Sequence, residues 1–320
     1  MTETVLSDDR VHAPGADRRW RESYYFSFFD QKHRIGGFSS IGKRAASGHS
    51  GSINVVWGPG RESLVASEFD TFETLDDNHA VAGLTYRGLA PFGAWEVAFD
   101  GRLNAGGDRV ECDRAALGPA ADNTVPVRYE LTFTPTHPPY VYRQRPEWSE
   151  LFTGHVDEVC TVRGTLTIGD ETYDIDGRGG KDHSWGVRNW FAPVAWRWFD
   201  LVSDTGPSLT LWRAAFRPGD WTSDGAVFAG AGLSALDGYV ETVSTVEVPG
   251  RSKPLPKTLR AELTAGGRTY GLTGEVRRVL PVMFVRDDRV SWNDRALVEC
   301  TFDDGSTGWA NVEFAELVTE

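Results

Sequence analysis

The chain has few cysteines, no long apolar run and a shortage of positive charge, and each of these features argues against certain classes of function. We interpret its three cysteines, Cys112, Cys160 and Cys300, as packing residues in a reduced compartment, since each lies in or beside an alternating run. The longest apolar runs are too short to span a bilayer, so we expect no membrane insertion. With 46 acidic against 33 basic residues and a formal net charge of −13, the surface should repel nucleic acid.

Motifs for several kinds of chemistry are also missing from the most distinctive part of the chain, residues 179–200. It contains no glycine-rich phosphate loop, no nucleophile elbow and no zinc-ligand spacing, so we expect neither a cofactor nor a metal. The stretch Met1–Arg21 carries charges and a proline but no apolar core, so we predict neither a signal peptide nor an anchor and expect a cytoplasmic protein. The sequence does not decide whether the protein forms a homodimer.

Helical periodicity is hard to find, whereas short alternating runs broken by Gly, Asp, Asn or Pro are frequent. This pattern predicts an all-β, antiparallel fold with few short helices, for which the candidates are Pro146–Phe152 and Cys112–Leu117. The predicted strands are Ser52–Trp57, Ala80–Tyr86, Trp95–Leu103, Val127–Thr134, Val156–Ile168, Glu171–Gly177, Ser208–Phe216, Leu259–Ala265, Arg268–Arg277 and Ala296–Phe302.

Turn chemistry and proline placement indicate how the strands are connected and divided. Gly169-Asp170, Gly266-Gly267 and Asp303-Asp304-Gly305 predict antiparallel hairpins. A proline-containing segment from Thr134 to Pro146 interrupts the strand pattern near the middle. We therefore predict a tail at 1–20, one β-domain at 21–150 and a second at 151–320, each closed as a barrel or sandwich so that few edges are exposed.

Asp182 and His183 follow Gly177-Arg178-Gly179-Gly180, which we interpret as a tight turn that aims an acid and a base into a cavity. Neighbouring side chains on a strand face opposite ways, so one would face the pocket while the other anchors the turn. As a catalytic group, Asp182 would have a pKa raised by burial. The structural alternatives are a salt bridge from Asp182 to Arg188 or Arg197, and a core role for His183.

Tryptophans are concentrated directly after this acid and base. Trp185, Trp190, Trp196 and Trp198 lie within fourteen residues, and Arg188 lies among them. Indole faces stabilise cationic intermediates by about 1–2 kcal/mol per ring when desolvated, so these residues are candidates for an aromatic substrate pocket. The same rings could instead fill a barrel interior as core residues, and both interpretations stay open.

Two other segments add candidates for the same site. In Gly154–Val159, His155 and Asp157 share one strand face and Glu158 takes the other, so a second proton-transfer group could come from His155 or Glu158. The aromatic stretch Trp20–Asp30 contains Glu22 and Tyr24, which are candidate pocket residues.

Taken together, Trp20–Tyr24, His155 with Glu158, and Gly180–Arg188 resemble the double-lipocalin superfamily. That superfamily includes the acyclic carotenoid hydratases and the lipocalin-like pericyclases. The resemblance implies two tandem lipocalin-like β-domains, a ligand pocket at or near their interface, and cofactor-independent chemistry on hydrophobic substrates. It also implies that Asp182 or His183 passes a proton to an alkene or to a tertiary hydroxyl.

From this resemblance and the residues we expect a hydratase, dehydratase or isomerase that acts on a hydrophobic, isoprenoid-like small molecule by acid–base catalysis. The catalytic candidates are Asp182, His183, His155 and Glu158. The substrate-binding candidates are Trp185, Arg188, Trp190, Trp196, Trp198, Tyr24 and Glu22. Two alternatives remain: a natural-product cyclase that acts by shape, and a non-catalytic carrier of hydrophobic ligands.

Overall fold

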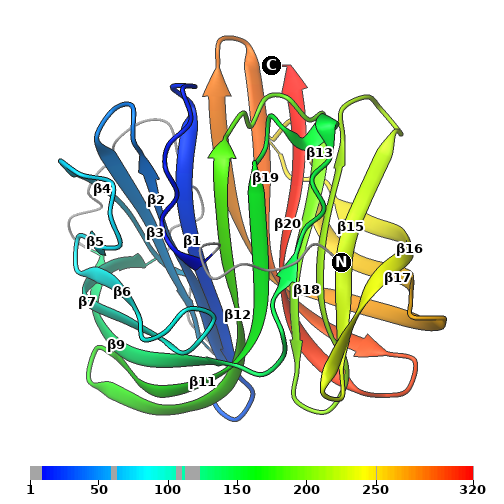
Figure 1. The fold of residues 1–320 in the computed structure, drawn as a ribbon. Helices are drawn as coiled ribbons and strands as arrows, with labels where there is room; N and C mark the ends of the chain where they lie inside the picture. Colours follow the sequence, from blue (N-terminus) through cyan, green and yellow to red (C-terminus); the bar gives the residue numbers. More distant parts are fainter. Residues whose placement is uncertain (1–8, 59–62, 106–109, 112–122, 250, 320) are drawn as a thin grey trace. The chain divides into compact units, whose positions relative to one another are not determined.

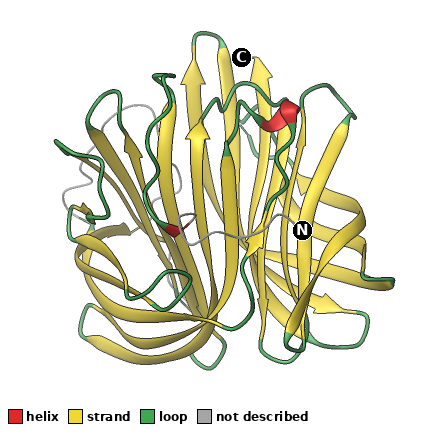
Figure 2. Ribbon diagram, viewed as in Figure 1, coloured by secondary structure: helices red, strands yellow, loops and turns green. Residues whose placement is uncertain are grey.

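The computed structural model describes residues 9–58, 63–105, 110–111, 123–249 and 251–319, with the backbone alone at 110–111. Strands make up most of it, and helix is confined to short pieces such as the 3-10 turn η2 (Pro146–Trp148) (Figure 2). The predicted all-β fold is therefore confirmed. Every strand pairing is antiparallel among the described residues, except the short parallel pairing of β8 with β18.

The described chain divides into two compact units. The first comprises the described residues of Met1–Gly107 and Arg114–Asn189, and the second those of Asp108–Asp113 and Trp190–Glu320. The first unit thus continues about 40 residues beyond the boundary predicted near residue 150. The reason is strand pairing, because the hairpin that follows the proline-containing segment pairs with strands of the first unit on both sides.

In the first unit, eight strands form a closed barrel, in the order β9-β11-β12-β1-β2-β3-β4-β7 and back to β9 (Figure 1). Two register pairs between β4 and β7 complete the ring. The strands of this unit are β1 (Trp20–Asp30), β2 (Ile35–Arg44), β3 (His49–Trp57), β4 (Leu64–Thr71), β5 (His79–Val81), β6 (Leu84–Gly88), β7 (Trp95–Ala105), β9 (Thr124–Pro135), β10 (Tyr140–Val141), β11 (Gly154–Ile168) and β12 (Glu171–Val187).

The second unit is also a ring of eight strands, which run from β13 to β20 and close through the pairing of β17 with β18. Its strands are β8 (Val110–Glu111), β13 (Ala195–Ser203), β14 (Ser208–Ala215), β15 (Trp221–Ala229), β16 (Gly232–Val246), β17 (Leu255–Ala265), β18 (Arg268–Arg286), β19 (Arg289–Phe302) and β20 (Thr307–Thr319). Each barrel has its own apolar core, formed by the inward-facing side chains of alternate strand positions.

The predicted strands are present, although most of them are longer than predicted and one is divided. Ala80–Tyr86 is divided into β5 and β6 by Ala82 and Gly83, which both have positive φ angles. The supposed glycine turn at 177–180 is instead the middle of β12. A Cβ at Gly177 or Gly179 would collide with the backbone carbonyls of Phe29 and Ser27 on β1, so these glycines permit close strand packing rather than a turn.

The predicted connections agree with the structure where it is described. All three hairpins are present, between β11 and β12, β17 and β18, and β19 and β20. Of the predicted helices, Pro146–Phe152 contains only η2, and Cys112–Leu117 lies outside the described residues together with Cys112 itself. Cys160 and Cys300 are buried, as expected of packing residues.

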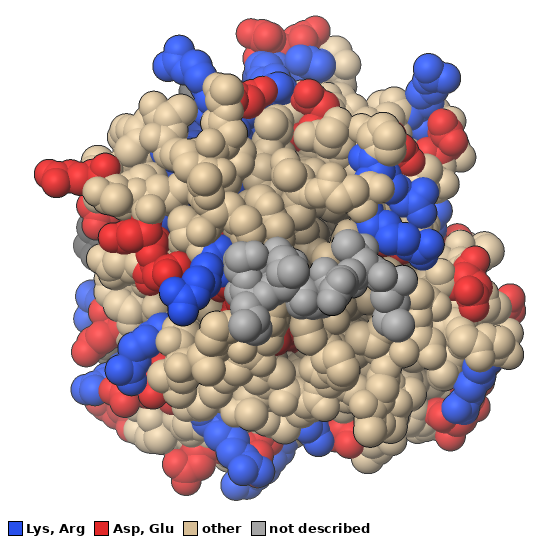
Figure 3. Space-filling view, viewed as in Figure 1, with Lys and Arg blue, Asp and Glu red and all other residues tan. Residues whose placement is uncertain are grey.

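Two properties of the described residues bear on possible partners. No helix among them has the length and apolar character needed to cross a membrane. On the face drawn in Figure 3, lysine and arginine side chains are interspersed with acidic ones. That face therefore shows mixed charge rather than a field of one sign.

Candidate active site

One end of the first barrel's interior is polar, and strand alternation explains why. On β1, Glu22 and Tyr24 share the inward face with Phe26, a core residue. On β12, the cross-strand partners of Tyr24 and Phe26 are His183 and Lys181. The inward face of each strand therefore changes from apolar to charged along its length.

Glu22 lies at the centre of a buried carboxylate–histidine cluster. Its Oε1 is 2.6 Å from His183 Nε2 and 3.1 Å from His12 Nδ1. Burial alone would raise the pKa of Glu22, but the two histidines outweigh it and lower that pKa. Burial lowers the pKa of His183 despite Glu22, so a neutral imidazole faces a carboxylate.

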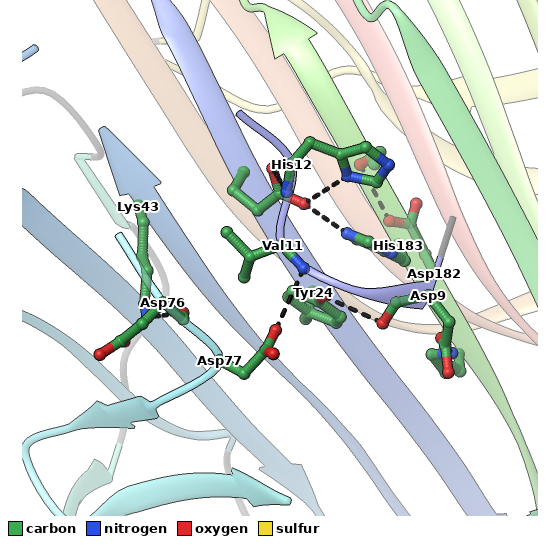
Figure 4. Close-up of polar contacts among 12 residues, drawn as sticks. Asp9, Val11, His12, Tyr24, Lys43, Asp76, Asp77, Asp182 and His183 are labelled. Atoms are coloured by element: carbon green, nitrogen blue, oxygen red, sulfur yellow. Dashed lines mark hydrogen bonds and ion pairs between the residues drawn. The ribbon is translucent and has the colours of Figure 1, made fainter. Parts of the chain in front are cut away.

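Aromatic rings hold these imidazoles in place. Tyr24 stacks on His183 at 4.0 Å between ring centroids, and Trp185 stacks on His12 at 3.7 Å. His183 thus contacts two of the other predicted residues, Tyr24 and Glu22. His12 comes from the segment predicted as a tail, which crosses this end of the barrel and also supplies Asp9 (Figure 4).

Beside this cluster, Lys181 pairs with two carboxylates inside the barrel. Its ammonium group pairs with Asp9 and, at 2.5 Å, with Glu158, and it lies 4.9 Å from the centroid of the Trp95 ring. Burial would lower the pKa of Lys181, but Glu158 and Asp9 raise it instead. Burial and the nearby Asp9 raise the pKa of Glu158, so the raised carboxyl pKa expected at Asp182 is found at Glu158.

A cavity of about 570 Å³ opens at this polar end, and His79 lines it. His79 begins β5 and is only 3% exposed, yet neither ring nitrogen has a hydrogen-bond partner among the described residues. Burial, assisted by the charge of Lys43, lowers the pKa of His79 to about 3, so its ring is neutral. The lining residues are Asp9, Arg10, Asp77, Asn78, His79, Thr85, Tyr86, Arg87, Gly88, Leu89, Ala90, Pro91, Trp95, Glu96 and Ala98.

Lys43 fixes the loop that carries His79. Its ammonium group donates to the carbonyl oxygens of Asp76, at 2.8 Å, and of Asn78, and it also pairs with the Asp76 carboxylate (Figure 4). The sequence did not single out His79 or Lys43. The available signal was alternation, because His79 precedes the core residue Val81 by two positions and therefore shares its inward face.

Asp182 and His155 form a separate cluster on the opposite face of β11 and β12. His155 Nε2 lies 2.6 Å from Asp182 Oδ2 and 2.9 Å from Asp157 Oδ1. Burial alone would lower the pKa of His155, but the two carboxylates raise it to about 10. Burial would raise the pKa of Asp182, but His155 lowers it, so the expectation of a raised pKa is wrong for this residue. His155 is the partner that pairs with Asp182, and Arg188 also lowers the pKa of Asp182 electrostatically.

The remaining predicted residues are divided between the two units. Arg188 belongs to the first, where its guanidinium lies 6.0 Å from the centre of the Phe152 ring. Trp190, Trp196 and Trp198 belong to the second, where Trp190 stacks on Trp196 at 5.6 Å. Trp196 is fully buried and donates to Glu313 Oε2 at 2.9 Å. Only Trp185 among the four tryptophans therefore lies in the histidine cluster of the first barrel.

Within the described part of the chain, two sets of side chains have ligand atoms close enough to hold a metal ion: His12, Glu22 and His183, and His155, Asp157 and Asp182. In each set the imidazole nitrogens already contact the carboxylates. Lys181 acts electrostatically on His183, and Lys43 on Glu22, which disfavours another cation in the first set. The absence of a metal stays a prediction.

Comparison with solved structures defines the class of this fold. A protein of Nitrosomonas europaea provisionally assigned as AttH superimposes with a TM-score of 0.63 at 13% identity, with 94% of each chain covered. CghA with Sch210972 gives 0.60 at 11%, covering 93% of this chain and 89% of that one. Kievitone hydratase from Nectria haematococca gives 0.57 at 12%, with the same coverage. Among curated proteins, none matches the chain significantly.

These likenesses, together with the two eight-stranded rings, show that the chain has the fold of two β-barrels that the resemblance to the double-lipocalin superfamily implied. It belongs to the family described as Domain of unknown function (DUF7064), whose model matches residues 6–318. At identities of 11–13%, the solved structures establish the fold of this chain. Its chemistry has to be inferred from its own residues.

Proposed function

We propose that this protein is an enzyme of the hydratase, dehydratase or isomerase kind, which moves a proton on a largely apolar small molecule in the cavity of the first barrel. One observation carries the proposal: His79 is buried and neutral, has no hydrogen-bond partner for either ring nitrogen among the described residues, and lines that cavity. Unsatisfied buried polar groups are costly and are concentrated at functional sites.

A neutral imidazole offers one lone pair and one N–H group. In a dehydration, the lone pair of His79 accepts a proton from substrate carbon, and the imidazolium returns it to the departing hydroxyl, so that an alkene and water are formed. In an isomerisation, the same proton returns to a different carbon. Trp95 and Leu89 in the cavity lining provide apolar contact for the substrate body.

The fold adds weaker support, since one of the structures it resembles is a hydratase by name. The residues behind the cavity support proton chemistry more directly. Tyr24 lies between His79 and His183, with ring centroids 4.3 Å and 4.0 Å away. Tyr24 keeps its proton, because burial raises its pKa. His79 is thus held in a fixed orientation against a neutral phenol.

Substitution of His79 tests the proposal. We expect His79→Gln to reduce kcat/KM by about 10²–10⁴-fold, the range for loss of a positioned acid–base group, while the fold is retained. The assay incubates wild type and variant with a panel of terpene alcohols and follows loss of water by mass spectrometry.

The matched control is His49→Gln, which changes an exposed histidine on β3 and should leave turnover unchanged. Full activity of His79→Gln would remove His79 from the mechanism. If wild type instead bound a panel member tightly and released it unchanged, the carrier function would replace the enzymatic one.

The pH dependence of turnover should show a low histidine pKa. Because the pKa of His79 is lowered to about 3, its ring stays unprotonated from pH 8 down to pH 5. We therefore expect kcat/KM to change less than about twofold over this range, whereas an ordinary histidine base with a pKa near 6.5 would lose more than tenfold. A half-maximal point between pH 6 and 7 would contradict the assignment of His79 as the base.

A further inference from the structure

Two arginines lie side by side inside the second barrel. Arg197 on β13 and Arg213 on β14 are direct cross-strand partners, and Arg213 is only 8% exposed. Their inward orientation follows from alternation, since Phe199 and Leu211, two positions away on the same strands, are core residues. Like charges placed opposite each other destabilise a sheet, so a negative charge near this pair would reduce the repulsion between the two guanidinium groups.

The protein supplies only part of that compensation. Among the described residues, Glu241 is the one acid that pairs with either arginine, at 3.4 Å from Arg197 Nε and 3.3 Å from Arg213 Nη1. Its other oxygen accepts a hydrogen bond from the Tyr239 hydroxyl at 3.0 Å. The Nε atoms of both arginines are buried without a hydrogen-bond partner in the described part of the chain. One carboxylate is thus shared by two guanidinium groups.

Positive charge also exceeds negative charge farther along the same interior. Asp294, which shares the inward face of β19 with the core residue Ala296, pairs with both Arg251 and Lys253 at 2.5 Å and 2.7 Å. Burial lowers the pKa of Lys253 to about 8 despite Asp294, and repulsion from Arg197 contributes. Four cations therefore share two carboxylates inside this barrel, in a protein whose net charge is strongly negative.

An aromatic surface accompanies the arginine pair. The Trp221 ring centroid lies 4.3 Å from the Arg213 guanidinium and 5.5 Å from that of Arg197. Trp221 is half-buried at the start of β15, next to the end of β14, so it lies at the barrel end rather than in the core. A flat ligand body could contact this ring while its charged group reached the arginines.

We propose that this end of the second barrel binds a small organic anion, a carboxylate on a flat unsaturated body, with the carboxylate at Arg197 and Arg213 and the body against Trp221. The planar guanidinium fork matches a carboxylate. A single negative charge fits, because with Glu241 in place it leaves the two arginines balanced. The site lies in the second unit and does not rest on the function proposed for the first barrel.

The test compares two probes of the same shape, 2-naphthoate and the uncharged 2-naphthamide, by calorimetric titration of the full chain. We expect 2-naphthoate to bind at least about tenfold more tightly than the amide, since interactions with a buried charge contribute more than a tenfold change in affinity. Arg213→Met should remove this preference, and Arg213→Lys should retain part of it. His79→Gln should leave it unchanged.

A second variant gives a readout that a purely structural role would not produce. Glu241→Gln removes the internal competitor for the arginines, so 2-naphthoate affinity should rise, by about tenfold, while amide affinity stays the same. Equal binding of the two probes, no binding at millimolar concentration, or weaker binding of 2-naphthoate to a folded Glu241→Gln variant would each overturn the proposal.

Discussion

Replacing Lys181 with methionine is expected to lower the free energy of unfolding of the first barrel by about 3–5 kcal/mol, the cost of removing one partner from a buried ion pair. Lys181 is 2% exposed, and its ammonium group pairs with two carboxylates, Asp9 and Glu158. Methionine fills a similar volume but leaves both acids buried without a counter-ion. Urea denaturation at pH 8, monitored by tryptophan fluorescence, measures the change.

The pH dependence of this loss identifies its cause. Burial raises the folded-state pKa of Glu158 above that of the unfolded chain, so protonation of this carboxyl group relieves the penalty at low pH. The destabilisation should therefore be larger at pH 8 than at pH 5. Lys32→Met, at an exposed lysine, is the control and should change stability by less than about 0.5 kcal/mol. If the loss of unfolding free energy did not depend on pH, lost packing rather than unpaired charge would be its cause.

The fold could be predicted because it depends on local patterns. Alternation identified about half of the strands, and the turn pairs Gly169-Asp170 and Gly266-Gly267 identified hairpins, since both signals need only neighbouring residues. The division between the units was harder. Strands β11 and β12 follow a proline-containing break, but their partners β9 and β1 are set by tertiary pairing that no local pattern records.

The candidate site was predicted in part, for a related reason. The motif containing Lys181, Asp182 and His183 was singled out, and alternation separated its members correctly onto two faces. Barrel closure determines which face of β12 lies on the side of the cavity. Asp182 lies on the opposite face, with His155. His79 was missed because an isolated histidine at a strand end has no motif. Its significance comes from burial and from unsatisfied nitrogens, which only the structure shows.

The cluster on the opposite face of β11 and β12 should make the first barrel sensitive to alkali. His155 is a buried cation with a pKa raised to about 10, between Asp157 and Asp182. Because this pKa lies above that of the unfolded chain, near 6.5, its stabilisation is complete below pH 6.5 and is lost as the pH rises through about 10. We expect the free energy of unfolding to fall by about 3–5 kcal/mol between pH 6.5 and pH 10.

Substitution of His155 separates this effect from other alkaline titrations. At pH 7, His155→Asn should cost about 3–5 kcal/mol, because the buried Asp157 and the partly buried Asp182 lose their counter-ion. At pH 10 wild type has also lost much of that charge, so the difference in stability between wild type and variant should shrink. Urea denaturation of both proteins at pH 7, 8.5 and 10 measures this difference, with His49→Asn as the exposed control. A difference that stays constant with pH would mean that His155 is already neutral at pH 7, and that hydrogen bonding alone holds the two aspartates.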